Sequence, residues 1–205
     1  AGVTELTMLM MFTTIKKLNH YVKIAFGVSK ESFSGKLWAF PIQGVGQGNG
    51  AGPAIWALVS TPILRMMRAE GHGIVFRLGI SGDEVIFAGY SFVDDTDLAH
   101  SARSPTETAH DVVEGMQDAV NTWEGGLRAT GGALVPFKSH WSFIDVVCKD
   151  GKWWYATTTE APGSITVLDK DGNRQTLDRL STDEARRTLG VRLAPDGNFQ
   201  TEFEY

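Results

Sequence analysis

The chain has 205 residues, of which 42% are apolar and 21% charged, as is ordinary for a globular protein and too apolar for a disordered one. No uncharged apolar run approaches the roughly 18 residues that a membrane-spanning helix needs, and no signal peptide opens the sequence. A single cysteine, Cys148, cannot form an internal disulfide. We therefore expect an intracellular protein, in the cytoplasm, the nucleus or both, with no membrane partner.

Charge is distributed unevenly along the chain. The formal net charge of -5 argues against a protein whose main task is to coat nucleic acid. Residues 1–82, however, carry 8 Lys and Arg against 3 Asp and Glu, whereas residues 83–205 carry 11 against 21. Because a basic first part precedes an acidic second part, we expect the chain by itself to bind nucleic acid only weakly.

The first third of the sequence predicts two helices separated by strands. Apolar residues at helical spacing predict a helix from Thr4 to about Asn19. Aromatic and β-branched residues then predict two short strands, at 21–26 and 36–42. A second helix is expected over Pro53–Ala69, with a kink at Pro62.

A hairpin and a third helix are expected next. Strands at Ile74–Leu78 and Val85–Tyr90 flank a turn-rich connection, which is typical of a hairpin. Ser104 as N-cap and Glu107 as its capping-box partner predict the start of the helix. Its predicted end is the glycine pair Gly125-Gly126.

The last third is strand-like. Residues 141–147 and 153–158 are expected to pair across a polar turn, and residues 165–168 and 175–177 in the same way. Mixed helices and antiparallel hairpins together predict an α+β fold. No repeat, low-complexity tract or linker interrupts the sequence.

Two adjacent carboxylates, Asp94 and Asp95, follow the apolar pair Phe92-Val93. A tight turn can bring both carboxylates towards one point, where their oxygen atoms would suit Mg²⁺ or Mn²⁺. For the dipeptide alone, a solvated turn is the simpler interpretation, since Asp is a favoured turn residue.

The glycine-rich run from Gln43 to Pro53 allows three interpretations. Gly46-x-Gly48-x-x-Ala51 matches a dinucleotide-binding fingerprint, although the run has more glycines than a pyrophosphate turn requires. The glycines also permit close approach of the backbone to a flat or polyanionic partner. A flexible loop is the third interpretation.

Two further features after residue 130 are open to a functional and a structural interpretation. Lys138 follows a glycine-containing loop and is placed to meet a phosphate or donate a proton, although a lone lysine is commonly a surface residue. Trp141, Trp153 and Trp154 are able to stack on bases, whereas tryptophans in strand pairs are more often part of a core.

Taken in order, the glycine run, the aromatic-x-Asp-Asp segment and the Gly-rich turn ending in Lys resemble the palm of reverse transcriptases encoded by retrotransposons, of the non-LTR and group II intron type. The resemblance covers residues 1–145 and implies a polymerase palm-like antiparallel sheet with packed helices. Residues 146–205 are then expected to be a β-rich extension of unknown role.

The resemblance implies nucleotidyl transfer by an RNA-directed DNA polymerase with two Mg²⁺ (or Mn²⁺) ions, an RNA template, a DNA primer and a deoxynucleoside triphosphate. Asp94 is the principal metal ligand that it implies, Asp95 is secondary or structural, and Lys138 would protonate or screen the pyrophosphate. It also implies that the nucleotide or template is contacted by Gln47, Gly48, Asn49, Phe92 and Val93. Contacts on the primer side are implied for Trp141 and Ser142.

Departures from the family pattern define the alternatives. Gly46 and Gly52 stand where the family prefers Pro and Ser, and the family's first metal-binding Asp would lie ahead of Ala1, together with the fingers. We therefore expect a fragment that is inactive, or nearly so, by itself. One alternative is a catalytically dead fragment that binds nucleic acid or a partner. A lesser one is a dinucleotide-binding oxidoreductase, which needs parallel strands around Gly46–Ala51.

Overall fold

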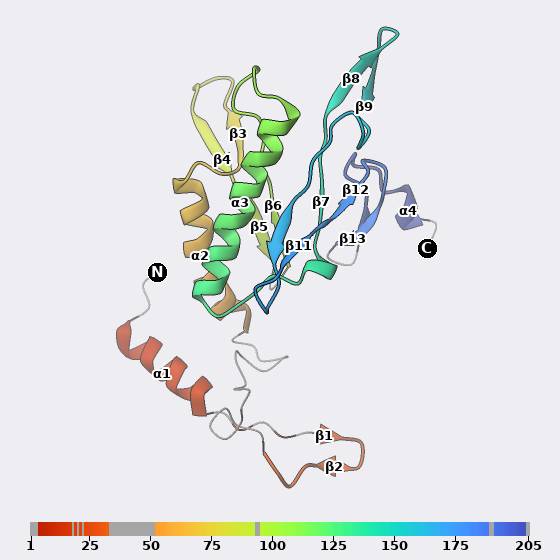
Figure 1. The fold of residues 1–205 in the computed structure, drawn as a ribbon. Helices are drawn as coiled ribbons and strands as arrows, with labels where there is room; N and C mark the ends of the chain where they lie inside the picture. The colour runs from red at the N-terminus through yellow and green to blue at the C-terminus, as the bar shows by residue number, and fades with distance from the viewer. Residues whose placement is uncertain are drawn as a thin grey trace. The chain divides into compact units, whose positions relative to one another are not determined.

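The computed structural model describes residues 4–17, 19, 21, 23–32, 52–92, 95–188 and 191–203. The chain divides into two compact units, Ala1–Leu58 and Val59–Tyr205. The described elements mix helices with two-stranded sheets that are mostly antiparallel, which confirms the α+β expectation (Figure 1). None of the helices within these ranges combines the length and the apolarity that a bilayer crossing demands.

The first unit contains one helix and one small hairpin. Helix α1 spans Glu5–Lys17, as the apolar spacing predicts. Strand β1, Lys23–Ile24, pairs antiparallel with β2, Gly27–Val28. The strand expected over 21–26 is therefore shorter, because the chain turns between β1 and β2. The second expected strand, 36–42, lies outside the described residues.

Helix α2, Gly52–Ala69, and the hairpin after it agree with the sequence. The helix continues through Pro62, and its buried side chains include Ile63 and Met67, which are four residues apart and so lie on one face. Strands β3, Ile74–Arg77, and β4, Glu84–Phe87, pair antiparallel. The second strand was expected to continue to Tyr90. It ends earlier because the strand is interrupted at Ala88, after which the chain forms a new hairpin.

That new hairpin consists of β5, Gly89–Phe92, and β6, Asp95–Leu98, which pair antiparallel. Gly89 has a φ of 155°, and a Cβ atom built on it would lie 2.2 Å from the carbonyl oxygen of Asp97. A side chain at this position would therefore push the two strands apart.

Helix α3 spans Ala109–Ala129, and the structure corrects both predicted ends. Its N-cap is Thr108, which forms a capping box with Asp111. The carboxylate of Glu107 instead accepts a hydrogen bond from the backbone N–H of Arg103 at 2.9 Å. Residues 104–107 form a separate turn, in which the backbone N–H of Glu107 donates to the carbonyl oxygen of Ser104 at 3.1 Å. The helix also passes through Gly125-Gly126 and ends at Ala129.

The remaining elements are short and follow α3 in chain order. A 3-10 turn, η1, comes first, and a four-residue helix, α4, comes last. Between them lie eight strands. The elements are η1 Pro136–Lys138, β7 His140–Ser142, β8 Val146–Lys149, β9 Lys152–Tyr155, β10 Thr166–Leu168, β11 Arg174–Thr176, β12 Asp178–Leu180, β13 Arg186–Thr188, β14 Val191–Leu193 and α4 Gln200–Phe203.

Three of these strand pairs are antiparallel hairpins, namely β8–β9, β10–β11 and β13–β14. The first two confirm the pairings expected from the polar turns. The strand expected over 141–147 is divided, however, and its first part, β7, pairs in parallel with β12 far along the chain. Burial of Trp141 accounts for this long-range pairing, since the indole packs on the core rather than on the adjacent hairpin.

A hydrophobic core joins α3 to the strands that follow it. Its buried members come from α3, β7 and the segment that holds β10 and β11, and they are Val113, Val120, Trp141, Ile165, Val167 and Leu177. Figure 1 shows α3 beside these C-terminal strands. The domain boundary expected at residue 145 therefore falls inside the second unit, whose core includes residues from both sides of it.

Candidate functional site

One face of the β5–β6 hairpin gathers aromatic and acidic side chains. Tyr90 is the register partner of Asp97, and Phe92 is the register partner of Asp95. Because partners directly opposite each other project from the same face, and alternate residues of a strand share a face, these four side chains lie together.

The opposite face of the hairpin is directed towards the protein core. Ser91 and Thr96 are register partners whose hydroxyl oxygens lie 2.9 Å apart. Leu98, two residues after Thr96 and so on the same face, packs against the core cluster. The aromatic and acidic face is consequently turned away from the core, and Phe92 is 62% exposed.

Asp97 is a site residue that the sequence analysis missed. A hydrogen bond with the Asp97 carboxylate raises the pKa of Tyr90, with burial and the carboxylate's charge acting in the same direction. The signal was present in the sequence as Asp95-x-Asp97, because residues two apart on a strand share a face. Tyr90 thus holds Asp97 in place beside Asp95.

The carboxylates of Asp95 and Asp97 have the chemistry that Mg²⁺ prefers. Within the described residues, however, no group of three or more His, Cys, Asp or Glu side chains is placed to hold a metal ion. Asp94 and Val93 lie outside the described residues, as do the expected nucleotide contacts Gln47, Gly48 and Asn49. The described donors are therefore too few for a complete metal centre.

Lys138 ends the 3-10 turn η1, where its backbone N–H donates to the carbonyl oxygen of Val135 at 3.0 Å. Its side chain is exposed. Across the ranges that the structure describes, no carboxylate forms an ion pair with it. The ammonium group is therefore open to an anion from solution, which suits the expected phosphate contact as well as an ordinary surface lysine.

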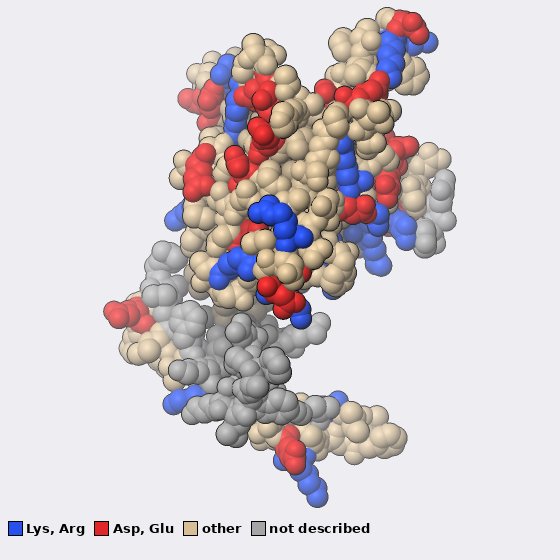
Figure 2. Space-filling model, in the orientation of Figure 1, with Lys and Arg blue, Asp and Glu red and all other residues tan. Residues whose placement is uncertain are grey.

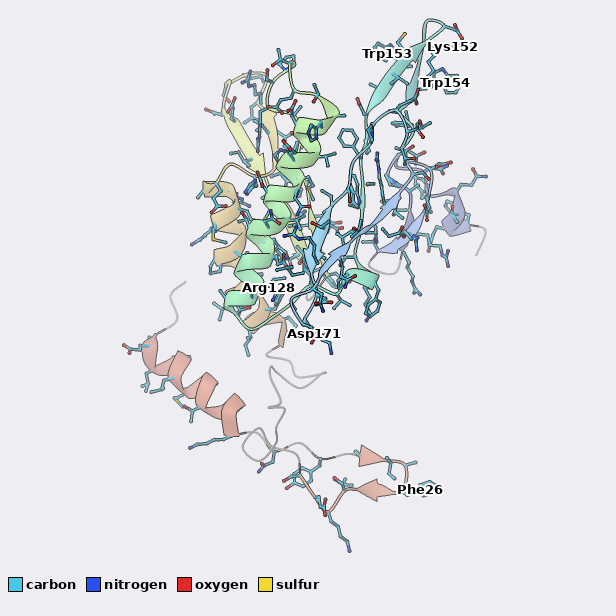
Figure 3. The ribbon with its side chains drawn as sticks, viewed as in Figure 1. Phe26, Arg128, Lys152, Trp153, Trp154 and Asp171 are labelled. Carbon is cyan, nitrogen blue, oxygen red and sulfur yellow. The ribbon has the colours of Figure 1, made fainter. Side chains whose placement is uncertain are left out.

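The three tryptophans that were weighed as stacking residues differ in burial. Trp141 is only 7% exposed and belongs to the core, so the primer-side role expected for its side chain is corrected. Its neighbour Ser142 is exposed. Trp153 and Trp154 are 72% and 56% exposed on β9, so for them the core interpretation is wrong (Figure 3).

Charged side chains are intermixed on the surface of the second unit. Figure 2 shows acidic and basic groups interspersed on the visible face, with no continuous basic track. A long track of phosphates therefore finds no extended complementary surface on this face.

The sequence matches no protein-family model and no curated protein. The functional argument therefore depends on the residues and on their arrangement in the β5–β6 hairpin.

Proposed function

We propose that the chain is the palm segment of an RNA-directed DNA polymerase of the retrotransposon type, similar to those of non-LTR elements and group II introns. The observation that carries the proposal is the antiparallel β5–β6 hairpin, in which two residues separate the strands. Phe92 and Asp95 close the hairpin on either side of them, on the face directed away from the core. Asp95 thus begins β6 directly opposite the aromatic Phe92 of β5, and Asp94 precedes it in the sequence.

In this proposal Asp94 and Asp95 would supply oxygen ligands, together with the third carboxylate that the family resemblance implies. Divalent metal held there would supply positive charge to lower the pKa of the primer hydroxyl and to offset the charge on the leaving pyrophosphate. Phe92 packs against primer or nucleotide, and the free ammonium of Lys138 protonates the pyrophosphate or screens its charge. Tyr90 keeps the neighbouring carboxylate of Asp97 oriented by its hydrogen bond.

Two alternatives make different demands on the structure. A catalytically inactive binding fragment is favoured by one observation, the lack of a complete metal-binding group within the described residues. A dinucleotide-binding oxidoreductase needs parallel strands near the glycine run, whereas the neighbouring β3–β4 and β5–β6 pairs are antiparallel. The strand directions therefore favour the polymerase over the oxidoreductase.

Primer extension tests the proposal. The open reading frame, extended upstream of Ala1, is assayed with Mg²⁺, an RNA template, a DNA primer and deoxynucleoside triphosphates. We expect template-dependent synthesis by the extended protein and little or none by the 205-residue chain. Salt-sensitive binding of the primer–template without any synthesis by the extended protein would support the inactive binding fragment instead.

A further inference from the structure

An arginine in the second unit lies against the core, and its buried Nε atom has no hydrogen-bond acceptor within the described residues. Arg179 on β12 is the register partner of Trp141 on β7. The guanidinium carbon Cζ lies 4.8 Å from the centroid of the Trp141 ring system, within the range of cation–π attraction. Because Trp141 is itself packed in the core, the stack holds the Arg179 side chain in one place.

Both members of this stack have an unsatisfied hydrogen-bond donor. Arg179 Nε and Trp141 Nε1 are buried and have no hydrogen-bond partner within the described residues. Burial is the cause that lowers the pKa of Arg179, and no carboxylate offsets it. Arginine nevertheless stays protonated in proteins, so a partly desolvated positive charge remains here, and no carboxylate of the described residues forms an ion pair with it.

Other arginines of the same unit show how such a charge is ordinarily satisfied. Arg186 Nη2 lies 2.8 Å from a carboxylate oxygen of Asp178 and 3.0 Å from one of Glu184. Arg128, which is also partly buried, donates from Nη2 to the carbonyl oxygen of Asp169 at 2.7 Å. The unsatisfied state of Arg179 is thus not a general feature of arginines in this unit.

We propose that Arg179, stacked on Trp141, forms an anion site that takes a phosphate group. Arg179 as a residue is only partly buried, whereas its Nε is buried, so the Nη end of the guanidinium is the part offered to a ligand. Two N–H groups in a fixed plane match two oxygens of a phosphate.

The proposed function gives the phosphate its source, and to that extent the inference rests on it. In a polymerase palm, the phosphate is a backbone phosphodiester of a bound nucleic-acid strand, and Arg179 positions that strand. The other source of the same chemistry is free phosphate or pyrophosphate. The two sources are separated by two binding measurements on the 205-residue chain.

The first measurement follows the side-chain N–H signals of arginine Nε and tryptophan Nε1 by NMR while inorganic phosphate is added. Arg179→Lys and Trp141→Phe identify the two signals. We expect both signals to shift along one saturating curve, and the Trp141 signal to stop responding in Arg179→Gln. No shift of either signal, or an unchanged response of Trp141 in Arg179→Gln, would overturn the anion site.

The second measurement is the anisotropy of a fluorescent DNA primer annealed to RNA, titrated with the chain at several low salt concentrations. Arg179→Gln is expected to weaken binding about tenfold and to reduce the salt slope by about one, as the loss of one phosphate contact does. The matched control is Arg187→Gln, which removes the same charge from an exposed site on β13 and is expected to have less than half that effect on the slope.

The two measurements distinguish the anion site itself from its assignment to a nucleic-acid strand. Equal effects of Arg179→Gln and Arg187→Gln, together with a phosphate response at Trp141, would retain the anion site and overturn its assignment to a nucleic-acid strand. Circular dichroism and thermal unfolding of Arg179→Gln and Arg179→Lys show whether any loss comes from unfolding. These results are independent of primer extension, so the anion site and the polymerase proposal fail separately.

Discussion

Gln117 and Thr166 are joined by two reciprocal hydrogen bonds. Gln117 Nε2 donates to the carbonyl oxygen of Thr166 at 2.8 Å, and the backbone N–H of Thr166 donates to Gln117 Oε1 at 2.7 Å. The Gln117 side chain of α3 thus makes the hydrogen bonds to Thr166 of β10 that a neighbouring strand would otherwise make. Seven residues further along α3, the buried Glu124 accepts from the backbone N–H of Leu168 at 2.8 Å.

These contacts satisfy the edge of β10 that β11 does not cover. Gln117→Ala is expected to lower the free energy of unfolding by about 1–3 kcal/mol, because it leaves a partly buried N–H and C=O without partners. Urea unfolding measures the change. The control is Glu114→Ala on the same helix, where the side chain is 69% exposed and the expected change is within about 0.5 kcal/mol. Equal effects of the two substitutions would contradict this role of Gln117.

Alanine substitutions at the two adjacent glycines of α3 are expected to change the stability of the protein in opposite directions. A Cβ atom at Gly125 would meet nothing within 4 Å, so Gly125→Ala is expected to stabilise the helix by about 0.5–1 kcal/mol. A Cβ atom at Gly126 would lie 2.6 Å from Cγ2 of the buried Ile63. Gly126→Ala is therefore expected to destabilise the protein by about 1–3 kcal/mol through overpacking. Thermal unfolding of both variants checks the sign, and equal shifts would argue against this packing.

The sequence predicts local structure well where the deciding residues are neighbours. Helix α2 and the β3–β4 hairpin follow from apolar spacing and a turn-rich connection. The start of α3 was misplaced because two possible capping boxes follow each other in the sequence, Ser104 with Glu107 and Thr108 with Asp111. Only the folded chain shows that Thr108 and Asp111 form the box, whereas Ser104 and Glu107 belong to a separate turn before the helix.

Strand pairings and contacts between residues far apart in the chain could not be predicted from the sequence pattern. Trp141 was expected to belong to a strand that pairs with the following hairpin, whereas its strand pairs in parallel with β12. That choice depends on which apolar faces bury each other, and no local spacing encodes it. At the candidate site, the order of motifs singled out Phe92, Asp94 and Asp95, but the contact between Tyr90 and Asp97 appears only once the register is known.

His100 is expected to make stability depend on pH. Burial lowers its pKa from 6.5, the charges of Arg103 and His72 act in the same direction, and Glu107 and Asp118 oppose them. As pH falls below about 6.5, the unfolded chain binds a proton that the folded chain resists, so the free energy of unfolding decreases. This contribution is fully present above that pH and is lost as the pH falls towards the lowered pKa.

Thermal unfolding at about pH 7.5 and about pH 5.5 measures this dependence. In the unsubstituted chain the melting temperature is expected to be lower at the acidic pH, and His100→Gln is expected to reduce that difference. The control is His110→Gln, because the side chain of His110 is 77% exposed on α3. If the acid sensitivity is unchanged in His100→Gln but lost in His110→Gln, then His110 and not His100 causes it, which would contradict this prediction.

Glu160 is expected to titrate in strongly acidic solution. The ammonium group of Lys149 lies 2.5 Å from its carboxylate, and the backbone N–H and hydroxyl of Thr157 donate to the same group. Together they lower the pKa of Glu160 to about 2. Lys149→Met is expected to raise that pKa towards 4.5, which NMR titration of the Glu160 carboxyl carbon measures. An identical titration in Lys149→Met would show that Thr157 alone sets the pKa.

Primer extension by Asp94→Asn tests the polymerase proposal most directly. The control is Asp150→Asn, an aspartate in the β8–β9 turn whose φ of 52° asparagine also tolerates. In the protein extended upstream of Ala1, Asp94→Asn is expected to lower the rate of nucleotide incorporation by at least about a hundredfold, the scale for loss of one charge-stabilising group. Asp150→Asn is expected to retain the rate. Incorporation that survives Asp94→Asn undiminished would contradict the assignment of this hairpin to a polymerase active site.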